Sequence, residues 1–196
     1  GSMTFALMND ANLRDQLFKY GVRVNPNVIE DIQCAVIPVN TSLAGKQPKF
    51  APAPWLYFPL LNAPSDHVIT KNLNLIKSEF PSVIDVLDTK TGIKKQVILS
   101  SSAGSKVSNV PLLINLSQVK EQINPANFNQ PYNPVAVVLE GKFESVFKNR
   151  MIDDIIGNME FDYKEISANT KMIVVSDADI IRNDIRQRAD GIFISP

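Results

Sequence analysis

Apolar residues occur along this chain mostly in short runs, and two of these runs are hydrophobic at nearly every position. Residues 134–140 and 171–176 each contain at least four consecutive aliphatic or small apolar residues. A short, continuous apolar run is typical of a strand that is buried on both faces. A third run, at residues 55–61, is aromatic and contains a proline, which indicates the edge of a sheet or the end of a strand.

Shorter segments extend this strand-rich pattern. Strands are predicted at residues 22–24, 30–39, 96–100 and 112–116. Leu13, Leu17 and Tyr20 would lie on one face of a helix. We therefore expect a helix over residues 9–20, ended by Gly21 in the left-handed region.

Two long segments are rich in loop-forming or polar residues. Residues 40–54 contain a glycine and several prolines and are predicted to form a long loop of functional or mobile character. Residues 149–168 are predicted to include a mobile segment, and residues 177–188 to form a turn and a helix. Because predicted strands outnumber long helices, we expect a mixed, strand-rich sheet with few short helices, of α/β or α+β class.

Composition excludes several classes of protein. The chain has 196 residues, with 20 Lys+Arg and 20 Asp+Glu, so its formal net charge is zero. Proteins that bind nucleic acids or anionic membrane surfaces through basic residues need an excess of Lys and Arg. The sequence also lacks a run of about 18 apolar residues, the length that a membrane-spanning helix needs. No nucleic-acid partner is therefore expected.

The single cysteine and the single histidine limit the available chemistry. Cys34 lies in an apolar run and is interpreted as a small core residue, because one cysteine forms neither an internal disulfide nor a thiolate zinc site. His67 could serve as a general base, but no nucleophile motif G-x-S-x-G accompanies it, and a structural role in a turn is favoured. We expect no cofactor, no metal site and no enzymatic activity.

Two segments that follow predicted strands carry candidate ligand-binding groups. Asp177 and Asp179 could bind a divalent cation at the end of a buried strand, or Asp177 could cap the following helix while Asp179 complements its dipole. The serine-rich loop at residues 100–106 could hold an anion on its backbone N–H groups, or could be an exposed connection. Helix capping and an exposed loop are the favoured interpretations.

The aromatic run offers a further candidate. Trp55, Tyr57 and Phe58 could stack on a sugar ring or hold a partner strand, and aromatic residues at this spacing are more often part of a core. The residues for which we expect ligand or partner contacts, if the protein makes any, are Trp55, Tyr57, His67, Asp177 and Asp179.

Several segments of the chain are specific in combination: LFKYGVRVNP at 17–26, residues 31–34 and 37–40, PWLYFPLL at 54–61, HVITKNL at 67–73, VVLEGKF at 137–143, SVFKNR at 145–150, and IVVSD at 173–177 with Asp179. In these segments the chain resembles the GldG family, the gliding-motility-associated auxiliary component of an ABC transporter in Bacteroidetes-type bacteria. The likeness covers nearly all of the chain after residues 1–3, which look like an expression scar.

The resemblance implies a membrane-anchored parent protein with a large extracytoplasmic region. That region is related to a flavodoxin-like domain that binds partners and catalyses nothing, and residues 4–196 would be one domain cut from it. The implied location is the periplasmic side of the inner membrane, with the membrane reached only through anchor helices of the parent. The implied partners are the permease and ATPase subunits of the transporter.

Three functions are therefore weighed. The first is a non-catalytic interaction or scaffold module of an ABC-transporter complex linked to gliding motility or envelope export. The second is a sugar-binding or carbohydrate-active domain that uses Asp177, Asp179 and the Trp55 strand. The third, a substrate-binding protein of an importer, is disfavoured because two lobes and a hinge need a longer chain.

Overall fold

The computed structural model describes residues 3–8, 11–42, 45–64, 66–89, 91–148, 163–182, 184–188 and 191–195. Its strands are β1 (Met3–Ala6), β2 (Val22–Val24), β3 (Asn27–Asp31), β4 (Cys34–Asn40), β5 (Phe50–Leu61), β6 (Ile76–Lys77), β7 (Ile84–Val86), β8 (Lys94–Ser100), β9 (Ser105–Asn109), β10 (Leu112–Asn115), β11 (Pro134–Gly141), β12 (Thr170–Val175), β13 (Asp184–Arg188) and β14 (Gly191–Ser195). Its helices are α1 (Arg14–Lys19) and the short 3-10 helices η1 (Leu116–Lys120), η2 (Pro125–Asn127) and η3 (Ala178–Ile181).

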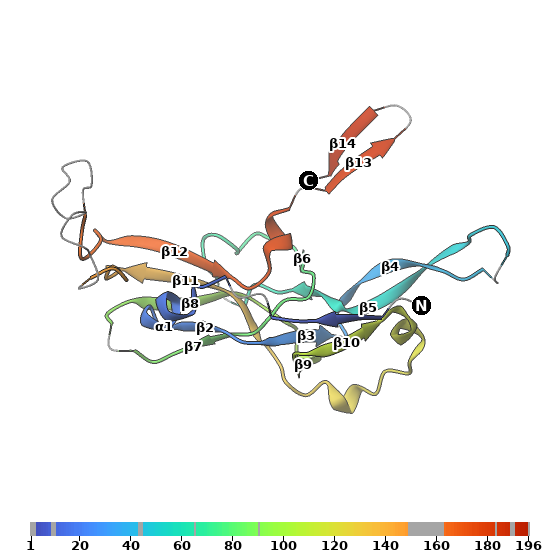
Figure 1. The fold of residues 1–196 in the computed structure, drawn as a ribbon, viewed down its shortest axis with the longest axis horizontal. Coiled ribbons are helices and arrows are strands. Elements are labelled where there is room, and N and C mark those ends of the chain that lie inside the picture. Colours follow the sequence, from blue (N-terminus) through green and yellow to red (C-terminus); the bar gives the residue numbers. More distant parts are fainter. Residues whose placement is uncertain are drawn as a thin grey trace.

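Several small antiparallel sheets make up the fold (Figure 1). Two of them have three strands, in the orders β12–β11–β8 and β4–β5–β6. The remaining pairs are β1–β10, β2–β7, β3–β9 and β13–β14. The strand-rich class with few short helices is confirmed. Of the two arrangements left open, the antiparallel pairing favours α+β, because parallel α/β sheets need long crossover helices.

The central strand is β11, and its prediction as a core strand is confirmed. Five consecutive residues, Val135 to Leu139, are buried. Val137 and Leu139 pack in a cluster with Tyr20 of the α1 end and Ile84 of β7. Val135, Ala136 and Val138 pack in a second cluster that includes Ile29 of β3 and Leu61 of β5. Both faces of β11 are therefore covered, as its continuous apolar sequence requires.

Strand β12 was expected to be equally buried, and this prediction is wrong. Among the described strands it pairs only with β11, so it lies at the edge of its sheet. Val174 packs into the first core cluster, whereas Ile173 is about half exposed. An apolar run alone does not distinguish a central strand from an edge strand that covers one side of a core.

Two predicted helices differ from the structure. The helix expected at 9–20 is α1, which begins only at Arg14 because Asn12 lies in the left-handed region at φ 55°. Gly21, at φ 87°, does end it as predicted. The helix expected within 177–188 is replaced by the 3-10 turn η3 and strand β13, because Arg182 is extended and β13 pairs with β14.

The long loop predicted at 40–54 is also wrong, because residues 50–54 are part of β5. Strands β4 and β5 form a two-stranded arm that extends away from the rest of the described chain (Figure 1). Most of the polar segment predicted to be mobile, residues 149–162, lies outside the described residues. Cys34, predicted in the core, is only partly buried at the start of β4.

Candidate functional site

Asp177, the first residue considered as a metal ligand, is hydrogen-bonded to other residues of the chain. Its Oδ1 accepts the backbone N–H of Asp179 at 2.8 Å, which caps η3. Its Oδ2 accepts both the hydroxyl of Ser78 at 2.6 Å and the backbone N–H of Glu79 at 2.8 Å. Both oxygens of this buried carboxylate therefore tie η3 to the segment after β6, as expected for a capping and anchoring residue.

Asp179 lies on the outside of the same turn. Its Oδ1 accepts from Nη1 of Arg182 at 2.7 Å, three residues further along the chain. Within the described ranges, no group of three or more His, Cys, Asp or Glu side chains is arranged to hold a metal ion. The geometry around Asp177 and Asp179 favours the capping interpretation over the metal-binding one.

Trp55 and Tyr57 lie on the inward face of β5 and are almost completely buried. Their rings make an edge-on contact with centroids 5.1 Å apart, and the ring of Phe80 stacks on Tyr57 at 5.8 Å. Burial, reinforced by the nearby carboxylate of Glu30, raises the pKa of Tyr57 to about 12. A ring that is covered in this way is part of a core and not a platform for a surface sugar.

His67 lies in a turn that precedes β6. Its Nδ1 accepts the backbone N–H of Ile69 at 3.2 Å. Its carbonyl oxygen accepts the N–H groups of Thr70 and Lys71 at 2.9 and 2.8 Å. These bonds agree with the structural interpretation of this histidine, because its Nδ1 is used as an acceptor within the turn.

Asp31 is a buried carboxylate that the sequence did not single out. Its oxygens accept the N–H and the hydroxyl of Ser102 at 2.7 and 2.6 Å, and the N–H of Gln33 at 2.8 Å. Burial raises its pKa above the ordinary value, although these hydrogen bonds oppose the shift. Ser102 of the serine-rich loop at 100–106 thus binds a side chain of the same protein. The favoured interpretation of this loop as an exposed connection is wrong, because Ser100, Ser101 and Ser105 are buried.

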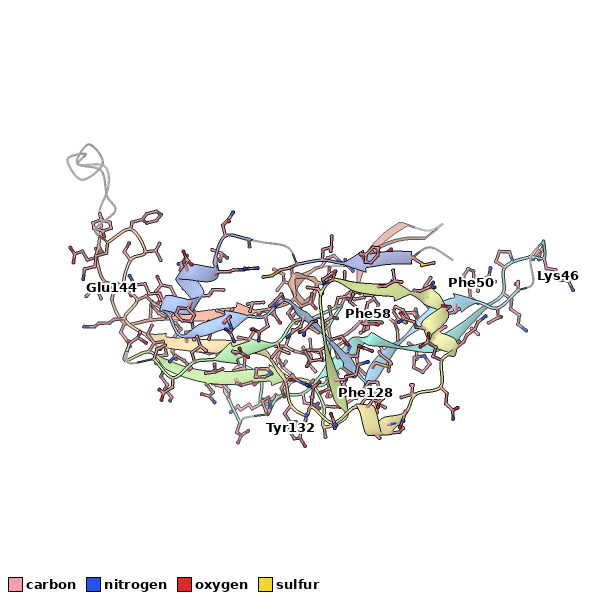
Figure 2. All side chains as sticks on the ribbon, turned by 60° about the horizontal axis from the view of Figure 1, so that its bottom comes forward. Lys46, Phe50, Phe58, Phe128, Tyr132 and Glu144 are labelled. Carbon is pink, nitrogen blue, oxygen red and sulfur yellow. The ribbon has the colours of Figure 1, made fainter. Side chains whose placement is uncertain are left out.

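One hollow in the described chain is a mostly apolar cavity of about 780 Å³. The strands β1 and β10 and the segment around Asn25 to Val28 form much of its wall, together with Ile37 of β4. Four aromatic side chains, those of Phe5, Trp55, Phe58 and Phe80, are among its lining residues; Phe58 is labelled in Figure 2. Of the residues considered from the sequence as ligand contacts, Trp55 and Phe58 line this cavity, whereas Tyr57, His67, Asp177 and Asp179 are not among its lining residues.

The β4–β5 arm is the second surface with functional potential. Opposite residues of the two strands, Val36 and Pro54, Pro38 and Pro52, and Asn40 and Phe50, share one exposed face. Val36 and Phe50 are 61% and 62% exposed. Lys46 and Phe50 lie near the outer end of the arm (Figure 2). We call this exposed, mostly apolar surface the arm face.

Hydrogen bonds order the end of the arm. Thr41 donates its N–H to the carbonyl of Lys49 at 2.8 Å, and the hydroxyl of Ser42 donates to the carbonyl of Gln47 at 2.6 Å. The N–H of Lys49 in turn donates to the hydroxyl of Ser42 at 2.6 Å. These bonds hold the described residues on either side of the turn in place without a partner, which lowers the entropy cost of association.

Comparison with known proteins identifies one relationship. The sequence model of a family described as "ABC-type uncharacterized transport system" matches residues 1–193. No curated protein and no solved structure matches the chain. Among the helices that the structure describes, none is long and apolar enough to cross a membrane.

Proposed function

The chain belongs to this ABC-type transport system family as an auxiliary component, and we propose that it acts there as a non-catalytic, extracytoplasmic interaction module. The partners we propose are the permease and ATPase subunits of the transporter, with the permease as the one in direct contact. We further propose that residues 4–196 form a single domain on the periplasmic side of the inner membrane, in a complex that serves gliding motility or envelope export.

The observation that carries this proposal is the exposed apolar arm face. An isolated β-hairpin whose apolar side chains face water has little stability of its own and is prone to associate. Val36 and Phe50 would leave water if a partner covered this face. Burial of apolar side chains is the main favourable term in protein association.

The charges of the arm indicate what such a partner offers. Between Asp31 and Asp66 the sequence contains no Asp or Glu, whereas Lys46 and Lys49 lie beside the turn of the arm. The arm is thus locally positive in a chain whose formal net charge is zero. A partner surface with an apolar strip and a few carboxylates at one end would complement it, and the two lysines would steer the encounter.

The sugar-binding alternative finds no comparable support. The oxygens of Asp177 are bonded within the fold, and the ring of Trp55 is buried. Carbohydrate sites need exposed aromatic faces with polar groups beside them. We therefore do not propose a carbohydrate ligand for these residues.

An affinity capture from solubilised envelope membranes of the source bacterium tests the proposal. The bait is the tagged domain, and a second bait carries Val36→Ser and Phe50→Ser on the arm face. A third bait carries Ile173→Ser on β12, a matched loss of an exposed aliphatic side chain far from the arm in the sequence. We expect the wild-type and Ile173→Ser baits to enrich the permease, and the arm variant to lose most of it. Equal capture by all three baits, or none by any, would argue against the arm as the contact.

A further inference from the structure

The apolar cavity beneath β1 and β10 has the properties of a site for an uncharged hydrocarbon ligand. Its volume of about 780 Å³ lies within the range of about 300–1,000 Å³ that is typical of small-molecule sites. None of its lining residues is an Asp, Glu, Lys, Arg or His. A charged group buried in this cavity would therefore find no counter-charge, and its desolvation would oppose binding.

Three polar side chains in the cavity wall, those of Asn27, Ser82 and Ser176, are engaged with the protein. Ser82 donates its hydroxyl to the carbonyl of Asn27 at 2.7 Å, and Oδ1 of Asn27 accepts the N–H of Val83 at 2.9 Å. The hydroxyl of Ser176 donates to the carbonyl of Ser82. A ligand that brings its own buried hydrogen-bonding groups, such as a peptide, would have to compete for these bonds.

The packing around the cavity is also less complete than in the two clusters on β11. The cluster at this end has only three buried hydrophobic residues, Val28, Trp55 and Tyr57. Seven partly buried residues surround them, among them Ala6 of β1 and Ile114 of β10. Protein interiors are normally close-packed, so a space of this size beside a sparse core cluster can hold a ligand.

We propose that this cavity binds one acyl chain, with its head group left outside in water. A hydrocarbon chain carries no group that needs a hydrogen-bond partner, and its rotatable bonds let it follow a cavity walled by several elements. The exposed side chains of Phe5 on β1 and of Leu7, which follows β1, extend the apolar wall toward solvent. This site is independent of the arm face, and the proposal does not rest on the proposed interaction with a permease.

The mechanism predicts a specific dependence on the ligand. Each methylene that leaves water for the cavity should tighten binding about fourfold, until the cavity is full. A fatty acid and its methyl ester of equal length should bind alike, because the head group makes no contact with a charged wall. Salt should have little effect on the affinity for the same reason.

Trp55 provides a direct probe, because it is the only tryptophan of the chain and lines the cavity. The experiment titrates the protein with a dibrominated C18 fatty acid below its micelle concentration and follows quenching of Trp55 fluorescence. The unbrominated C18 acid and a C8 acid serve as controls. A second titration uses vesicles of brominated phosphatidylcholine, which distinguishes a free fatty acid from an acyl chain presented by a bilayer.

Two variants separate cavity binding from surface adsorption. Ala6→Phe places a ring into the cavity, and Leu113→Phe adds the same ring on β10 at a residue that does not line it. We expect saturable quenching at one ligand per protein, weakened at least tenfold by Ala6→Phe and unchanged by Leu113→Phe. Quenching in either titration supports an acyl site and identifies the source of the acyl chain.

Other outcomes would overturn the proposal. They are the absence of saturable quenching in both titrations, equal affinities of the protein for the C8 and C18 acids, or equal binding of the C18 acid by Ala6→Phe and the wild type. Because the first two are measured on the unaltered protein, the test stands even if Ala6→Phe fails to fold.

Discussion

Replacing Asp177 by alanine tests whether this carboxylate stabilises the fold or serves to bind a ligand. The change removes the acceptor of three donors, which are the hydroxyl of Ser78 and the N–H groups of Glu79 and Asp179. Ser78 is fully buried, so water does not replace the lost partner of its hydroxyl. Hydrogen bonds to a charged group contribute about 1.5–3 kcal/mol each, and a lost helix cap costs about 1 kcal/mol.

The expected loss in free energy of unfolding is therefore about 4–7 kcal/mol, a large part of the stability of a typical domain. Urea titration followed by Trp55 fluorescence measures it, because this single tryptophan is buried in the folded chain. Asp179→Ala is the matched control and should cost less than about 1 kcal/mol, since the pair with Arg182 is exposed.

A double-mutant cycle isolates the contact with Ser78. The variant with both Asp177→Ala and Ser78→Ala should lose about 1–3 kcal/mol less than the sum of the two single losses, because no orphaned hydroxyl remains. Equal losses for Asp177→Ala and Asp179→Ala would refute the anchoring role. A stabilisation by Mn²⁺ that disappears in Asp177→Ala would instead identify a metal site.

The remaining predictions concern the core, a turn and a titrating group. Leu139→Ala should lower the free energy of unfolding by about 3 kcal/mol in a urea titration, because Leu139 is fully buried on β11; a loss below about 1 kcal/mol would contradict the assigned core. Gly21→Ala should cost about 1–2 kcal/mol in the same assay, since Gly21 lies at φ 87° and a Cβ would come 2.3 Å from Cε of Lys95. Asp31 has a folded-state pKa above its ordinary value of 3.8, so its contribution to stability is present below pH 3.8 and is lost as pH rises through the folded-state pKa. The stability difference between wild type and Asp31→Asn, measured in urea across that window, should therefore shrink with rising pH, and a difference that grows would contradict the burial of this group.

Strands with a clear hydrophobic pattern of their own are predictable from the sequence. Residues 134–140 are apolar at nearly every position, and β11 is buried on both faces. Residues 22–24, 96–100 and 112–116 also lie in strands close to their expected bounds. Gly21 ends α1 because a left-handed position after a helix strongly favours glycine, which is a local effect that sequence reveals.

The β4–β5 arm shows why local sequence does not predict every strand. The prolines of residues 40–54 indicate a loop, yet Pro52 lies in β5 directly opposite Pro38 of β4, where neither residue needs to donate a hydrogen bond across the pair. Likewise, Ile181 and Ile185 have helical spacing, but pairing with β14 places Ile185 in strand β13. Both outcomes depend on partner strands that local spacing does not specify.

The candidate sites depend even more on distant contacts. The apolar cavity is built from segments between Thr4 and Ser176, and among its lining residues the sequence indicates only Trp55 and Phe58 as ligand contacts. The environment of Asp31 is created by Ser102, 71 positions away along the chain. Residue type left helix capping and metal binding open at Asp177 and Asp179; the cap on η3 and the contact with Ser78 favour capping at Asp177.

Site-specific photo-cross-linking of the protein in the source bacterium tests the central claim most directly. A photoreactive amino acid replaces Phe50 on the arm face or, as the control, Ile173 on β12, and envelope membranes of the source bacterium are irradiated before purification. Our account predicts a cross-link to the permease of the ABC-type system from position 50 and none from position 173. Cross-links to the permease from position 173 alone, or from neither position while the complex is intact, would contradict the role of the arm.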